Sequence, residues 1–255
     1  MFERNHTQAN ARVAQLVEHN LAKVGVAGSS PVSRSYQRRY IRKDGFFLQI
    51  LNLRYEMRFN MKKLILVTSP PACGKPYVSM KLAEALSHVV YLDKDTLICL
   101  SKQIFKVANQ PYNRSSDFFN AEIRDYEYEA IMALAMEALT YEDTVLINAP
   151  FTSEIRDDEY IAGLKAELKK KGAKLVVVWV RTDPEVCHQR MIDRNSDRDT
   201  WKLTHWFEYI KDVNFTIPTN LEDPDDPGTL LIFDNSSYDT FDKNLQELKE
   251  KIENM

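Results

Sequence analysis

The feature that most constrains the fold is an alternation of short apolar runs with helical patterns, which begins near residue 61 and continues to the end of the chain. Five runs are rich in β-branched residues and predict strands at 63–69, 89–93, 144–150, 174–181 and 229–235. Helical patterns lie between and after them, at 75–87, 95–107, 115–140, 154–171, 184–194, 198–211 and 240–253. Runs that are apolar throughout, each followed by a helix, are typical of parallel strands covered on both faces. The sequence therefore predicts a three-layer α/β fold with a five-stranded parallel sheet whose first strand is central.

The loop between the first predicted strand and the first predicted helix is a candidate binding site. The stretch LVTSPPACGKPYVSMKLAEAL covers residues 66–86 and has Gly74 and Lys75 at the start of the helix. Phosphate-binding loops follow the pattern Gly-x-x-x-x-Gly-Lys-[Ser/Thr], in which backbone N–H groups surround the phosphates and the lysine reaches the terminal ones. Here Ser69 replaces the first glycine and Pro76 replaces the hydroxyl residue. We expect a phosphate site, and an ordinary strand-to-helix turn is the alternative.

Two carboxylates follow the second predicted strand, at the edge of the sheet where ligands of such folds bind. Asp95 would face the same crevice as Lys75 and is the candidate base for an acceptor hydroxyl. Asp93 is its rival. A cap for the helix that starts near Thr96 is the simpler role for either carboxylate.

Arginines recur after the fourth predicted strand, at positions 190, 194 and 198. A spacing of four residues would align them on one face of a continuous helix, and a planar guanidinium can bind phosphate oxygens bidentately. We expect a lid near 186–205 in which Arg190 and Arg194 reach the phosphates. The alternative is a solvated basic face paired with Asp193, Asp197 and Asp199.

The loop sequence is similar to that of small bacterial P-loop kinases, the AAA-type ATP-binding group that includes the zeta-toxin, chloramphenicol phosphotransferase and gluconate kinase families. Three later stretches extend the resemblance along 61–255, which are YLDKDTL (91–97), VCHQRMIDRNSDRDTWK (186–202) and FDNSS (233–237). The resemblance implies a P-loop nucleoside triphosphatase fold that binds ATP and transfers its γ-phosphoryl group to a hydroxyl of a small molecule. It also implies that Asp95 is the base, that 186–202 forms the lid and that Asn235 lies near the adenine.

In kinases of this type a helix at the place of 115–139 closes over the acceptor. Its first turns carry side chains that could take part, namely Glu122, Arg124, Asp125 and Tyr128. A solvated helix face explains the same charges. The later half is predicted to be core, with Ile131, Leu134, Met136 and Leu139.

Three positions depart from the chemistry of that group. Pro76 has no hydroxyl to bind Mg²⁺, and it biases Lys75 away from helical dihedral angles. Ser69 would cost about 1 kcal/mol if the loop needs a positive φ there. Asn148 is a neutral amide where many P-loop enzymes have an acidic residue that holds the metal through water. We therefore expect weakened Mg²⁺ binding, and a nucleotide-binding protein without catalysis is the alternative function.

These arguments give one set of site residues. The candidate catalytic residues are Lys75, Asp95, Arg190 and Arg194. The candidate nucleotide-binding residues are Pro71, Ala72, Cys73, Gly74, Lys75, Pro76, Tyr77, Arg190 and Asn235. No direct metal ligand is predicted, and Asp93 and Asn148 would hold Mg²⁺ only through water. ATP and Mg²⁺ are the expected cofactors, and the identity of the acceptor is left open.

Residues 1–60 differ in charge from the rest of the chain, since they carry ten Lys and Arg against four Asp and Glu. The net charge of −3 therefore divides into +6 for this segment and −9 for residues 61–255. The stretch 11–35 resembles the conceptual translation of a transfer-RNA gene. This predicts a non-native or disordered extension before a domain that starts at Met61 or Met57. A basic arm that binds nucleic acid is the disfavoured alternative.

Composition and cysteine content complete the sequence-based expectations. The chain of 255 residues is 44% hydrophobic, enough to bury a core. It contains no apolar run of about 18 residues and no signal-peptide pattern, which predicts a cytoplasmic protein without a membrane partner. The three cysteines, Cys73, Cys99 and Cys187, are far apart and odd in number, so free thiols are expected rather than a disulfide framework or a metal site.

Overall fold

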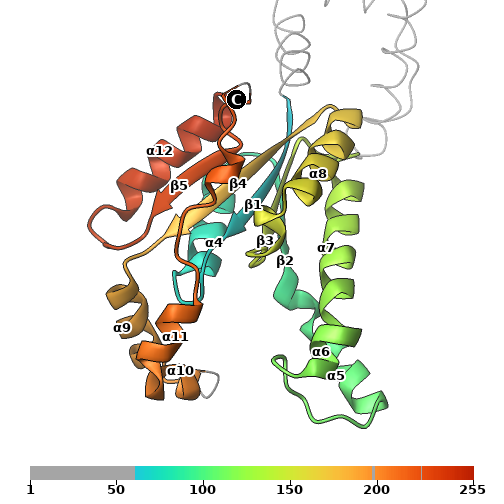
Figure 1. Ribbon diagram of the computed structural model, residues 1–255. Coiled ribbons are helices and arrows are strands. Elements are labelled where there is room, and N and C mark those ends of the chain that lie inside the picture. The colour runs from blue at the N-terminus through green and yellow to red at the C-terminus, as the bar shows by residue number, and fades with distance from the viewer. Residues whose placement is uncertain (1–60, 197–198, 225) are drawn as a thin grey trace, which may run out of the picture. The chain divides into compact units, whose positions relative to one another are not determined.

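The sheet is parallel throughout, with the strand order β2-β3-β1-β4-β5 (Figure 1). The computed structural model describes residues 61–196, 199–224 and 226–255. The strands are β1 (Lys62–Thr68), β2 (Val89–Asp93), β3 (Thr144–Asn148), β4 (Ala173–Arg181) and β5 (Leu230–Asp234). The five-stranded parallel sheet with a central first strand is therefore confirmed. The expectations for residues 1–60 lie outside the described residues.

The strand register brings the candidate polar residues to one edge of the sheet. Val67 near the end of β1 is the partner of Asn148 in β3, and Asn148 is in turn the partner of Asp93 in β2. Parallel strands that end in register carry their following loops to the same edge, where ligands bind in open α/β sheets. The register thus sets the loop that follows β1, Asp93 and Asn148 side by side.

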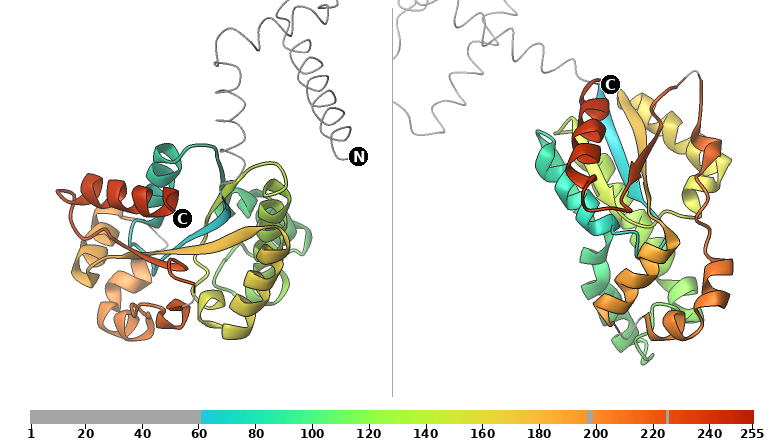
Figure 2. Two further views of the ribbon diagram at one scale, coloured as in Figure 1. Left: turned by 90° about the horizontal axis from the view of Figure 1, so that it is seen from above. Right: turned by 90° about the vertical axis from the view of Figure 1, so that its left-hand side faces the viewer.

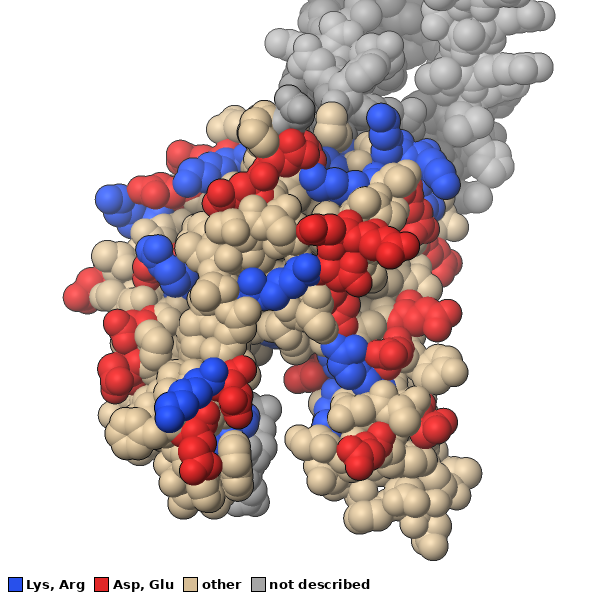
Figure 3. All heavy atoms as spheres, viewed as in Figure 1, with Lys and Arg blue, Asp and Glu red and all other residues tan. Residues whose placement is uncertain are grey.

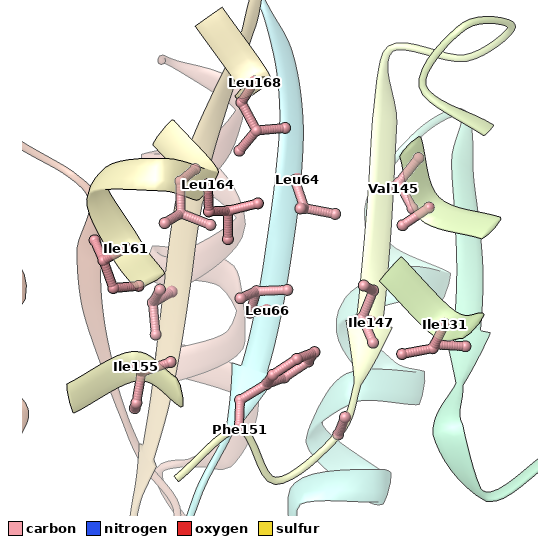
Figure 4. Packing of buried hydrophobic residues seen from close by; sticks show 14 of the residues in the cluster. Leu64, Leu66, Ile131, Val145, Ile147, Phe151, Ile155, Ile161, Leu164 and Leu168 are labelled. Carbon is pink, nitrogen blue, oxygen red and sulfur yellow. The ribbon is translucent and has the colours of Figure 1, made fainter. Parts of the chain in front are cut away.

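Alternate residues of β1 bury themselves on opposite faces of the sheet. Leu64 and Leu66 belong to one core cluster with residues of α7 (Arg124–Ala138) and α8 (Asp158–Lys170). Figure 4 shows Leu164 of α8 on the side of Leu64 and Ile131 of α7 beside Ile147 of β3. The opposite face is covered by α4 (Lys75–Ala85) and α12 (Phe241–Glu253), and its core holds 15 buried residues, Ile65 and Val67 among them. The two pairs of helices lie on either side of the sheet in Figure 2, which gives the three layers predicted from the sequence.

Two groups of short helices extend beyond the C-terminal ends of the strands. One group follows β2 and comprises the 3₁₀ helix η1 (Lys94–Leu97), α5 (Ile98–Val107) and α6 (Asp117–Glu122). The other follows β4 and comprises α9 (Pro184–Arg194), α10 (Thr200–Thr204) and α11 (Trp206–Asp212). Figure 3 shows an open gap between them, below the ends of the strands, and charges of both signs are mixed over this face.

Two short 3₁₀ helices, η2 (Glu154–Arg156) and η4 (Thr219–Leu221), complete the secondary structure of the described residues. In that part of the chain no helix has both the length and the apolar character needed to cross a bilayer.

The structure corrects three details of the sequence-based prediction. The helix expected at 115–140 is broken at Ile123, whose φ of −130° leaves the helical region and separates α6 from α7. Leu134 was expected in the core but is 46% exposed, because α7 turns Ile131 and Ala135 toward the sheet instead. Helix α9 ends at Arg194, and its C-cap Asn195 has a φ of 44°, so one helix does not carry arginines 190, 194 and 198. Arg198 lies outside the described residues.

Candidate functional site

The loop between β1 and α4 leaves the N-terminus of α4 open. Gly74 occupies the N-cap position in the left-handed region (φ 80°), and no side chain caps the first turn of the helix. A helix end in this state presents unpaired N–H groups and a positive dipole, which together favour an anion. Ala72 also has a positive φ, of 65°, whereas Ser69 does not. The strain anticipated at Ser69 is therefore carried by Ala72.

Gly74 is required by its surroundings as well as by its φ. A Cβ added to it would lie 2.4 Å from Nδ2 of Asn235, closer than non-bonded atoms approach. Asn235 follows β5 and is buried, and its Nδ2 donates a 2.8 Å hydrogen bond to the carbonyl of Cys73. Thr182, just after β4, donates a second hydrogen bond of 3.0 Å to the same carbonyl. The ends of β4 and β5 thus fix the loop from one side.

Lys75 lies at the first position of α4 and is tied to the neighbouring strands. Its Nζ donates a 2.8 Å hydrogen bond to Oδ1 of Asn148, and Nδ2 of Asn148 donates one of 2.8 Å to Oδ2 of Asp93. An ammonium only donates and a carboxylate only accepts, and the amide of Asn148 satisfies both neighbours because it accepts through Oδ1 and donates through Nδ2. Burial lowers the pKa of Lys75 to about 8, although the charges of Asp95 and Asp93 oppose this effect.

The two carboxylates after β2 have different surroundings. Asp93 caps η1, since its Oδ1 accepts a 2.9 Å hydrogen bond from the N–H of Asp95, and it also accepts from Asn148 and from the hydroxyl of Tyr91. Asp95 is exposed, and its carboxylate has no hydrogen-bond or ion-pair partner among the described residues. The capping role foreseen for either residue belongs to Asp93, and Asp95 stays available.

The arginines predicted for the lid differ in their contacts. Arg190 donates from Nη2 to the backbone carbonyl of Asn235 at 2.8 Å. Its Nη1 is buried without a hydrogen-bond partner and lies 3.4 Å from the place of a Cβ on Gly74. A buried unpaired donor on a cation is costly, and this one adjoins the open end of α4. Arg194 instead pairs with the fully buried carboxylate of Asp199, with 2.8 Å between Nε and Oδ2.

A buried ionic cluster fixes the segment that carries Asp95. Lys94 forms a 2.6 Å ion pair with Glu127 of α7, and both side chains are almost fully buried. Arg114 donates two hydrogen bonds to the same carboxylate, of 2.6 and 2.7 Å, and the hydroxyl of Ser101 also donates one to it. Burial opposes the charge on Glu127, but the hydrogen bonds from these residues outweigh it and lower its pKa to about 2.

Arg124 and Tyr128, predicted near the acceptor, lie together at the start of α7. The guanidinium of Arg124 stands 4.6 Å from the centre of the Tyr128 ring and pairs with Glu154 at 2.5 Å. Burial raises the pKa of Tyr128 to about 12, so its hydroxyl stays protonated. The carboxylate of Asp125 pairs with Arg124 and is exposed.

Several contributing residues were not anticipated. Ser79 donates a 2.8 Å hydrogen bond to the carbonyl of Lys75 and lies 3.4 Å from Oδ1 of Asn148. Its position four residues after Lys75 puts both on one helix face, a spacing that could have revealed it. Thr182 and Glu127 left no comparable signal, because their partners are distant in sequence.

The sequence matches a known family and its fold matches solved structures. Residues 64–210 match the AAA domain family, whereas no curated protein matches the chain. A protein from Chloroflexus aurantiacus J-10-fl assigned as a kinase is 18% identical, with a TM-score of 0.50 over 75% of this chain and 99% of that one. A gluconokinase from Sinorhizobium meliloti 1021 is 17% identical, with a TM-score of 0.44 over 76% and 93%. A shikimate kinase from Acinetobacter baumannii in complex with shikimate is 19% identical, with a TM-score of 0.39 over 76% and 95%.

At these identities the solved structures bear on the fold alone. The sheet order and the loop before α4 agree with the P-loop nucleoside triphosphatase fold expected from the sequence. The matched segment contains the loop before α4, Asp95, Asn148 and the two arginines that were predicted for a lid, Arg190 and Arg194. The chain belongs to the AAA domain family and resembles the small P-loop kinases within that fold.

Proposed function

We propose that this protein binds ATP and transfers its γ-phosphoryl group to a hydroxyl of a small molecule. The observation that carries the proposal is the convergence of Lys75 and Arg190 on the uncapped N-terminus of α4. Phosphoryl transfer depends on positioning and on neutralising the charge of the transferred group, so it requires cations around a preformed cradle. Lys75, Arg190 and the open helix end supply both.

The residues present fit the phosphates of a nucleotide. An anion at the loop would accept hydrogen bonds from the free N–H groups of α4. It would also give the unpaired Nη1 of Arg190 an acceptor. Lys75 would turn from Asn148 toward the terminal phosphate, and the negative charge there would raise its pKa above 8 and keep it protonated.

Mg²⁺ is accommodated less fully. Among residues 61–196, 199–224 and 226–255 there is no cluster of three His, Cys, Asp or Glu side chains that could hold a metal ion. Pro76 offers no side-chain oxygen, and the amide of Asn148 is already shared between Lys75 and Asp93. With Asp95 assigned as the base, Asp93 is the carboxylate left to meet the ion, so phosphate oxygens and water would supply most ligands. Bound in this way, the ion would neutralise charge on the phosphates, and we expect its affinity to be weak.

Asp95 is the proposed base. It is exposed in η1, directly after β2, and lacks a partner in the described part of the chain, so its carboxylate can accept a proton from an acceptor hydroxyl. The buried pair of Lys94 and Glu127 positions it, because Lys94 precedes it directly and cannot move without breaking that pair.

The charges on the acceptor side favour an uncharged or cationic acceptor. Lys94 and Arg114 both form ion pairs with Glu127, and Arg124 forms one with Glu154. To pair with one of these cations, an acceptor with a carboxylate or phosphate group would have to displace Glu127 or Glu154, which costs binding free energy. A neutral polyol or an aminated sugar does not require this displacement.

Calorimetric titration of ATP into the purified protein tests the nucleotide site. Lys75→Ala is expected to abolish ATP binding, because the loop then lacks its charge at the terminal phosphates. Lys81→Ala is the matched control, since Lys81 lies on the same helix and forms a surface ion pair with Glu84. Equal ATP affinity in the two variants would refute the phosphate-loop assignment.

A panel of hydroxyl compounds separates the kinase from its alternative. Magnesium-dependent ADP release that requires one acceptor supports the kinase. ATP binding without turnover on any acceptor supports a catalytically impaired nucleotide-binding protein, which Pro76 and Asn148 favour chemically.

A further inference from the structure

Two cysteines far apart in the sequence meet beneath the phosphate loop. Cys73 lies in the loop and Cys187 in the first half of α9, and their Sγ atoms are 3.5 Å apart. Both are free thiols, 1% and 0% exposed, whereas Cys99 is exposed elsewhere. The role described for the loop does not require a thiol at either position.

We propose that Cys73 and Cys187 are an oxidation site, and that a reversible disulfide between them weakens nucleotide binding at the loop. The effect on ATP rests on the proposed function, whereas formation of the disulfide does not. A disulfide brings two sulfur atoms to about 2.05 Å, so from their present separation they must approach by roughly 1.5 Å.

The surroundings shift the pKa values of the two thiols in opposite directions. The hydrogen bond from Cys187 lowers the pKa of Cys73 against the opposing effect of burial, with help from Thr182 and the charge of Arg190. The same contact, together with burial, raises the pKa of Cys187. Cys73 is therefore the thiolate that reacts first, and Cys187 is the thiol that resolves it.

The reaction balances with a peroxide as oxidant. The Cys73 thiolate attacks one oxygen of hydrogen peroxide, the O–O bond breaks, and with one proton the products are a sulfenic acid and water. Cys187 then gives up its proton and attacks Sγ of Cys73, which forms the S–S bond and releases a second water. Two thiols lose two electrons in total and the peroxide gains them. A dithiol such as dithiothreitol reverses the change by thiol–disulfide exchange.

The disulfide would act on the loop through its backbone. The Cys73 carbonyl accepts hydrogen bonds from Thr182 and Asn235, so the loop cannot move as a whole toward α9 without breaking those hydrogen bonds. Closing the disulfide would therefore change the local backbone conformation around Cys73. That change would displace the N–H groups of residues 72–75 from the positions proposed to hold phosphate. Cys187 is one turn before Arg190, so the same bond would also shift the guanidinium beside Gly74.

The test uses the full chain with Cys99→Ser, so that the two buried thiols are the only ones present. After treatment with hydrogen peroxide, remaining thiols are alkylated and the digested protein is mapped by mass spectrometry. We expect a linked pair of peptides containing residues 73 and 187. Calorimetry should then give an ATP affinity at least tenfold lower than for the reduced protein, restored by dithiothreitol.

Reciprocity gives an independent measurement. If the disulfide weakens ATP binding tenfold, saturating ATP must disfavour the disulfide tenfold, which raises the midpoint potential in a glutathione buffer by about 30 mV. Cys187→Ser in the same background retains a donor to Cys73 but cannot form the bond. Before peroxide treatment it should bind ATP with the affinity of the reduced protein. After treatment its oxidation stops at the sulfenic acid of Cys73, so no linked peptides should form and the tenfold loss of ATP affinity caused by the disulfide should not appear.

The outcomes separate this inference from the proposed function. Absence of the linked peptides, with both thiols alkylated or Cys73 oxidised alone, overturns the oxidation site. A linked pair with unchanged ATP affinity and unchanged midpoint potential overturns its action on the loop. If the reduced protein fails to bind ATP, the proposed function and the action on the loop both fall, and the peptide map alone then decides whether the oxidation site exists.

Discussion

Removing the charge of Glu127 gives the most direct check on how the segment of Asp95 is held. In Glu127→Gln the carboxylate that pairs with Lys94 and Arg114 becomes a neutral amide, and Lys94 is left charged in a position where it is only 5% exposed. Breaking a buried ion pair by removing one partner typically costs about 3–5 kcal/mol.

The pKa of Glu127 leads to a similar magnitude. It falls from 4.5 to about 2 in the folded chain because the hydrogen bonds outweigh burial, and each pKa unit corresponds to about 1.4 kcal/mol, so the ionised carboxylate contributes roughly 3 kcal/mol. Because the folded pKa is the lower one, this stability is present above pH 4.5 and is lost as the pH falls toward about 2.

Urea unfolding followed by circular dichroism measures both effects. At pH 7 we expect the free energy of unfolding of Glu127→Gln to fall by about 3 kcal/mol. We expect the variant to lose less stability than the parent between pH 4.5 and 2. Glu129→Gln is the control, since Glu129 is an exposed residue of the same helix and its change should stay within about 0.5 kcal/mol. A loss below about 1 kcal/mol in Glu127→Gln would refute the argument that the cluster holds Asp95 in place.

Four further predictions concern the nucleotide site. ATP affinity should fall as the pH rises above about 8, because Lys75 of the free protein then loses the charge that would meet the phosphates. Titrations of the parent and of Lys75→Ala at several pH values will show whether this pH dependence comes from Lys75. Pro76→Ser should raise both the affinity for Mg²⁺ and the rate of turnover, and unchanged values would show that the missing hydroxyl does not limit the metal. Adding Asn148→Asp should raise the Mg²⁺ affinity and the turnover rate further. Without metal the new carboxylate would repel Asp93, and calorimetry with and without Mg²⁺ can distinguish the two effects. Arg190→Lys should lower kcat more than tenfold with the fold intact, since a lysine cannot supply the two parallel donors, and an unaltered kcat would remove Arg190 from the site.

The strands could be predicted from the sequence because their signal is local. Each run has a continuous apolar stretch, and the observed ends of β1 and β4 lie within one residue of the prediction. The break at Ile123 has no such signal, since the helical periodicity continues across it and no glycine or proline marks it. Leu134 was misassigned because apolar character alone does not say which side of a helix faces the sheet.

The candidate site was predictable only in part, for a related reason. Gly74 and Lys75 belong to one contiguous motif, so their meeting follows from local sequence. The contacts that complete the site join distant segments, as Asn235 does with Cys73. Glu127 was not singled out because a charged helix residue is usually solvated, and its burial depends on partners from three other segments of the chain.

The central place of β1 has a consequence for how the chain emerges from the ribosome. Its two neighbours, β3 and β4, begin at Thr144 and Ala173, so the second edge of β1 stays unpaired until roughly 100 more residues have been made. At about 5–20 residues per second, that delay lasts roughly 5–20 s. During this time the apolar run Leu64–Val67 has no completed sheet in which to bury itself, and it is open to chaperones or to other nascent chains. Synthesis rate and chaperone supply should therefore influence the yield of folded protein more than they would in a fold whose first strand pairs at once with its nearest neighbour in sequence.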